Sequence, residues 1–109
     1  MKKCFRNWMF LLVFMLPLLL LALESGDVDK GKETYDRCKV CHGASGEGNA
    51  AIAKALGATI PSLDSKEVQS LDDAALKKII VEGKGKMQPV KLSDQEITNV
   101  IAFLRSLKK

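Results

Sequence analysis

The sequence predicts an all-α domain of three main helices joined by short turns. From residue 27 onward, hydrophobic residues recur with helical spacing, capping signals stand at the expected helix starts, and no segment alternates as a strand does. This part of the chain holds only two aromatic residues, Tyr35 and Phe103, which make a thin core for a domain of this length. We therefore expect a bound group to complete the core.

The first helix is expected over residues 28 to 39, with Asp27 as its N-cap. Its apolar face is short, because only Val28, Gly31 and Tyr35 share one side at spacing i, i+3, i+7. Glycine inside a helix costs about 1 kcal/mol relative to alanine. Gly31 therefore predicts a close approach by another helix.

The second main helix is expected over residues 73 to 82. Asp72 is its N-cap, Leu71 and Leu76 can pack across that cap as a hydrophobic staple, and Gly83 ends the helix.

The last helix starts after Ser93, where Glu96 completes a capping box. Its apolar residues then recur at helical spacing: Ile97, Val100, Ile101, Phe103, Leu104 and Leu107. The glycine-rich stretches between the three helices predict loops, in which residues 50 to 56 form one or two helical turns.

The N-terminus is typical of a targeting signal. Basic residues precede an apolar run over residues 8 to 23, which only Pro17 interrupts. At about 1.5 Å per residue, a helix over this run is shorter than the hydrocarbon core of about 30 Å, and polar residues follow it, as in secretory signals.

We expect residues 1 to 24 to be a signal peptide or an N-terminal membrane anchor, and residues 25 to 109 to be the working domain. The domain is then exported, and is either soluble in a bacterial periplasm or tethered to the inner membrane through residues 8 to 23.

The charge of the exported part is small. The net charge of the whole chain is +4, and it falls to +2 once the three basic residues and one acidic residue of residues 1 to 24 are set aside. We therefore expect no nucleic-acid partner. We also expect the protein to be a monomer.

Cys38, Cys41 and His42 form a C-x-x-C-H sequence, which is typical of covalent c-type haem attachment. Two thiols must reach the two vinyl groups on one porphyrin edge, and two intervening residues let one turn of chain present both sulfurs. The next residue directs its imidazole at the iron. We expect His42 to be the proximal ligand and its other ring N–H to donate to a backbone carbonyl.

Three other interpretations of these residues stay open. A structural disulfide between Cys38 and Cys41 would suit an exported protein. A thioredoxin-like redox pair needs a βαβ setting, for which the sequence shows no strands. A zinc site needs a fourth ligand, and the exported part offers two cysteines and one histidine.

Met87 is the expected second iron ligand. His42 is the only histidine, and the other three methionines lie in the N-terminal segment. Glycines punctuate the loop over residues 83 to 89, and their backbone freedom lets a thioether turn inward; the alternative is a methionine that fills a gap. Ligation by histidine and methionine raises the reduction potential and leaves no open iron position, so electron exchange is the natural task.

These features resemble a small class I cytochrome c of the bacterial monohaem type over about residues 27 to 109. The resemblance includes the first helix with its contact to the last, the attachment motif with the glycines after it, a proline segment and the methionine loop: Gly31, Tyr35, Phe103, Cys38, Cys41, His42, Gly43, Gly46, Gly48, Pro61, Leu63, and residues 83 to 87. It implies a cytochrome c fold wrapped around one covalently bound haem c. It also implies that the Pro61 segment supplies the carbonyl that orients the proximal histidine.

The function that this resemblance implies is one-electron transfer between redox proteins, without enzymatic activity. Where the family usually has proline directly after the axial methionine, this chain has Gln88 before Pro89. A ligand-binding or peroxidatic haem protein with a displaceable methionine therefore stays open as an alternative. If the N-terminal segment is not cleaved, a membrane-tethered haem subunit of a respiratory complex is a further alternative.

Two sets of residues are expected around the cofactor. The haem is expected to pack against aliphatic side chains: Leu56, Ile60, Leu63, Leu76, Ile80 and Ile101. Four lysines are either solvated or ring the exposed edge and steer an acidic partner: Lys39, Lys84, Lys86 and Lys91.

Overall fold

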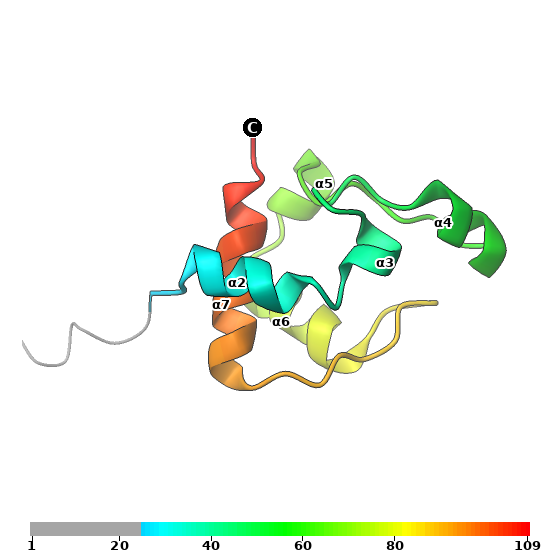
Figure 1. Ribbon diagram of the computed structural model, residues 1–109. Helices are drawn as coiled ribbons and strands as arrows, with labels where there is room; N and C mark the ends of the chain where they lie inside the picture. The colour runs from blue at the N-terminus through cyan, green and yellow to red at the C-terminus, as the bar shows by residue number, and fades with distance from the viewer. Residues whose placement is uncertain (1–24) are drawn as a thin grey trace, which may run out of the picture.

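The computed structural model describes residues 25 to 109, which contain six helices and no strand. In chain order these are α2 (Val28–Tyr35), α3 (Lys39–His42), α4 (Ala50–Leu56), α5 (Lys66–Gln69), α6 (Asp73–Glu82) and α7 (Asp94–Ser106) (Figure 1). The all-α prediction is confirmed for this part of the chain. The predicted signal peptide or anchor, residues 1 to 24, lies outside the described residues.

The two helices with the clearest capping signals form as predicted. Asp72 caps α6 by accepting from the Ala75 N–H at 2.7 Å. At α7, Ser93 accepts from the Glu96 N–H at 3.1 Å and the Glu96 carboxylate accepts from the Ser93 N–H at 2.8 Å, which completes the capping box. The short helix predicted over residues 50 to 56 is α4.

The first helix is shorter than predicted. It ends at Tyr35 instead of residue 39, because a tight turn follows in which the Cys38 N–H donates to the Tyr35 carbonyl at 2.7 Å. This turn lets α3 begin in a new direction. Val28 was also predicted on the buried face, yet its side chain is 42% exposed.

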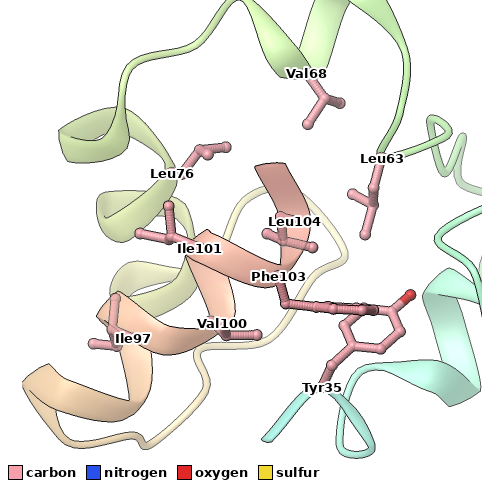
Figure 2. Packing of buried hydrophobic residues seen from close by; sticks show 9 residues of the cluster. All are labelled: Tyr35, Leu63, Val68, Leu76, Ile97, Val100, Ile101, Phe103 and Leu104. Atoms are coloured by element: carbon pink, nitrogen blue, oxygen red, sulfur yellow. The ribbon is translucent and has the colours of Figure 1, made fainter. Parts of the chain in front are cut away.

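The side-chain core is centred on α7. Its members are Tyr35, Leu63, Val68, Leu76, Ile97, Val100, Ile101, Phe103 and Leu104 (Figure 2). The rings of Tyr35 and Phe103 lie 5.0 Å apart between centroids with their planes inclined by 48°. This aromatic pair joins α2 to α7 next to the turn that leads into α3.

Helix α2 crosses α7 at Gly31, as its glycine predicted. A Cβ atom at this position would overlap the carbonyl oxygen of Asn99 and lie 3.0 Å from the Cβ of Phe103. Because the neighbouring oxygen belongs to the α7 backbone, the crossing can accept a side chain only if the two helices move apart.

Replacing Gly31 with alanine is expected to lower the free energy of unfolding by about 2 kcal/mol, although alanine favours the helix itself by about 1 kcal/mol. Urea unfolding of the haem-bound protein measures this change. The matched control is Lys32→Ala, on the exposed side of the same helix, which is expected to stay within about 0.5 kcal/mol of the wild type. Equal stability of the two variants would contradict the close crossing.

Candidate functional site

Cys38, Cys41 and His42 lie together on one helical turn. Cys38 is the N-cap residue of α3, and the His42 N–H donates to its carbonyl at 2.9 Å. Both cysteines are half-buried and free, so the alternative of a disulfide between them is not formed in this structure. The turn therefore offers two thiols and an imidazole to a single group.

Burial sets the protonation preferences on this turn. It lowers the pKa of His42, which favours the neutral imidazole that binds a metal. It also raises the pKa of the Cys38 thiol, with a further contribution from Cys41.

The imidazole of His42 has an orphaned nitrogen. Its Nδ1 atom is buried and has no hydrogen-bond partner, so the predicted bond from this ring to a backbone carbonyl is wrong for this structure. No described backbone carbonyl lies within hydrogen-bonding distance of this nitrogen. The Pro61 segment does lie beside the loop after α3, because the Leu63 N–H donates to the Gly46 carbonyl at 2.8 Å.

These donors fit a haem. Two free thiols on one turn match covalent attachment, and an imidazole kept neutral and without a polar partner matches an iron ligand. Within residues 25 to 109 no group of three or more histidine, cysteine and acidic side chains is placed to hold a metal ion by itself. No described strand supplies the thioredoxin setting.

Several large apolar residues outside the core are exposed. Val40 on α3 is 65% exposed, Leu56 on α4 is 43% exposed and Val81 on α6 is 47% exposed. Helix α4 buries none of its residues and projects from the rest of the molecule (Figure 1). Exposed apolar side chains of this kind are suited to packing against a large apolar group.

The six aliphatic residues predicted around the cofactor fall into two sets. Leu63, Leu76 and Ile101 are buried in the side-chain core, and Ile80 packs against it. By contrast, Leu56 is exposed and Ile60 is half-buried. Their contacts with a cofactor stay a prediction.

Met87 lies at the end of a tight turn between α6 and α7. The Lys84 N–H donates to the Met87 carbonyl at 3.1 Å, and the Met87 N–H donates back to the Lys84 carbonyl at 2.9 Å. The loop is anchored to α6 where the Val90 N–H donates to the Ile80 carbonyl at 2.8 Å. In Figure 1 this loop extends on the same side of α7 as α3 and α4. Iron ligation by Met87 stays a prediction.

The four predicted lysines differ in their surroundings. Lys39 pairs with Asp36 at 2.5 Å. Lys84, Lys86 and Lys91 are exposed and make no salt bridge within the described part of the chain.

Two contacts of the attachment turn were not found by sequence analysis. The Tyr35 hydroxyl donates to the Gly43 carbonyl at 2.5 Å, and burial, the largest cause, raises the pKa of Tyr35 to about 12, which keeps the phenol a donor. The Asn49 side chain donates to the Val40 carbonyl at 3.1 Å. Asn49 could have been identified as the N-cap of residues 50 to 56, but its contact with α3 carries no sequence signal.

No helix among residues 25 to 109 has both the length and the apolar character needed to cross a bilayer. The tether predicted over residues 8 to 23 lies outside the described residues.

The chain is similar to known cytochromes. A family model described as Cytochrome c matches residues 28 to 108. A solved structure, the KustC0563 c-type cytochrome, superposes with a TM-score of 0.61 at 28% sequence identity, over 72% of this chain and 98% of that one. No curated protein matches the chain.

Proposed function

This chain belongs to the cytochrome c family, and we propose that it carries single electrons between redox proteins outside the cytoplasm. The cofactor of the family is haem c, bound covalently, whose iron takes up and releases one electron. The observation that carries the proposal is the single turn on which two free thiols and an imidazole lie together.

The roles of the residues follow from their chemistry. Cys38 and Cys41 would hold the porphyrin through their sulfurs, and His42 would bind the iron. Met87 would supply the second iron ligand. Its support is that it is the only methionine outside the N-terminal segment and that its turn is held by two backbone hydrogen bonds. With both faces occupied by side chains, the site excludes substrate, which favours a carrier over an enzyme.

A redox titration tests this function. The purified protein is expected to take up one electron per chain and release it again, with one midpoint in both directions, and to show no sustained turnover of hydrogen peroxide. Rapid peroxide consumption would instead favour the peroxidatic alternative, with a displaceable Met87.

Acidic proteins are the partners that we propose. Lys84 and Lys86 flank the tip of the Met87 turn, and Lys91 follows on the same loop. Because no acidic residue among the described ones neutralises these three exposed side chains in a salt bridge, they would attract a negatively charged surface and speed the encounter.

The rate of electron exchange with anionic hexacyanoferrate is expected to fall as salt is added. Replacing both Lys84 and Lys86 with glutamate is expected to lower this rate about tenfold at low ionic strength. The matched control is Lys66→Glu on α5. A rate that is independent of salt, or an equal loss in the control, would contradict steering by the Met87 turn.

We also propose that residues 1 to 24 direct the domain to the periplasm. The mass of the mature protein separates a cleaved signal peptide from a retained anchor, which would favour a membrane-tethered subunit.

A further inference from the structure

The attachment turn α3 cannot stabilise itself. A helix of four residues leaves most of its carbonyls without an intrahelical partner, and so short a helix is unstable in isolation. Its position therefore depends on groups that bind these carbonyls from outside.

Those groups come from the end of the following loop. The Gly48 N–H donates to the His42 carbonyl at 2.6 Å, and the Asn49 N–H donates to the Cys41 carbonyl at 2.9 Å. The Asn49 side chain adds a third bond through Nδ2, which donates to the Val40 carbonyl at 3.1 Å. Asn49 thus binds two successive carbonyls of the turn.

The other end of the same amide serves α4. Asn49 Oδ1 accepts from the Ala51 N–H at 3.1 Å and from the Ile52 N–H at 3.2 Å, as an N-cap does. The orientation of the amide is fixed by this arrangement, because a flipped amide would place NH₂ against two N–H groups and oxygen against a carbonyl. One side chain therefore joins α3 to α4.

We infer that Asn49 is a positioning residue for haem ligation: its amide N–H, bound to Val40, holds the turn that carries Cys38, Cys41 and His42. This inference rests on the proposed function, in which those three side chains bind the cofactor. Capping of α4 alone would need only the acceptor, Asn49 Oδ1. The donor, Asn49 Nδ2, is not needed for the cap, and its partner is the Val40 carbonyl of α3.

Asn49→Ser separates the two roles. Serine caps a helix about as well as asparagine, but its hydroxyl is too short to take over the bond to Val40. Asn49→Asp is the second variant, since it keeps the shape and the acceptor and loses the donor. The matched control is Ser65→Asn, which exchanges the same two cap residues on α5, where the Ser65 hydroxyl accepts only from the Val68 N–H.

Amide hydrogen exchange in the haem-bound protein is the first measurement. In Asn49→Ser we expect the His42 and Gly43 amides, which form the two hydrogen bonds within α3, to exchange about fivefold faster. The Val100 and Ile101 amides of α7 are expected to keep their wild-type rates. Equal acceleration at all four amides, or none at His42 and Gly43, would overturn the inference.

The shifts of the His42 ring protons in the ferric protein are the second measurement, because they report ligand orientation. They are expected to move in both Asn49 variants and to stay in place in Ser65→Asn; unchanged shifts in the Asn49 variants would overturn the inference. The mass of the denatured wild-type protein is determined first. A wild type without covalently bound haem would refute the proposed function, whereas a haem-bound wild type with unaffected variants would refute only the role of Asn49.

Discussion

A protein in which Cys38 and Cys41 are both replaced by alanine is expected to lose the cooperative thermal unfolding transition of the wild type. The side-chain core holds two aromatic rings and is centred on α7. It does not extend to α4, which buries none of its residues. A domain near this size usually needs a cofactor, metal or disulfide to fold stably, and without its attachment sulfurs this chain has none.

Circular dichroism at increasing temperature measures the effect. The matched control is Val40→Ala, which removes a 65% exposed side chain between the two cysteines and leaves both sulfurs in place. It is expected to keep a cooperative transition. A sharp transition in the double alanine protein without haem would mean that side chains alone specify the fold.

Replacing Met87 with alanine is expected to lower the reduction potential by roughly 0.2 V, within the range of about 0.8 V that axial ligands span. A thioether ligand raises the potential, and alanine offers no donor atom in its place. The backbone of the turn is expected to persist, because its two bonds join main-chain atoms of residues 84 and 87.

Spectroelectrochemical titration gives the potential of each variant. Gln88→Ala is the control, since Gln88 is the exposed next residue on the same loop. Its potential is expected to match the wild type. Equal potentials for Met87→Ala and Gln88→Ala would show that the methionine is not an iron ligand.

The sequence predicted those helices whose ends are encoded locally. Asp72 and Ser93 cap α6 and α7 with their own side chains, within three residues, so their signals are readable without the fold. The end of α2 has no such capping signal in the sequence, because it is set by the turn in which the Cys38 N–H donates to the Tyr35 carbonyl. Helix α5 has four residues, too few for a hydrophobic period.

In the candidate site, too, the residues with a local sequence signal were predicted and the others were not. The attachment motif was evident because Cys38, Cys41 and His42 are contiguous enough to share one turn. The contacts that hold this turn were not evident from the sequence, since Tyr35 and Asn49 bind residues that are eight and nine positions away along the chain. The carbonyl predicted to accept from His42 was assigned to the Pro61 segment through the family resemblance, not through a local sequence pattern. The structure does not provide this hydrogen bond.

In the proposed electron carrier, side chains would occupy both faces of the iron, so that the protein exchanges electrons and binds no ligand. Optical titration of the reduced protein with carbon monoxide at neutral pH tests it most directly, with Met87→Ala measured alongside. We expect no binding by the wild type and ready binding by the variant. Ready binding by the wild type would contradict it, because the iron would then have an open position and the protein would be a ligand-binding or peroxidatic one.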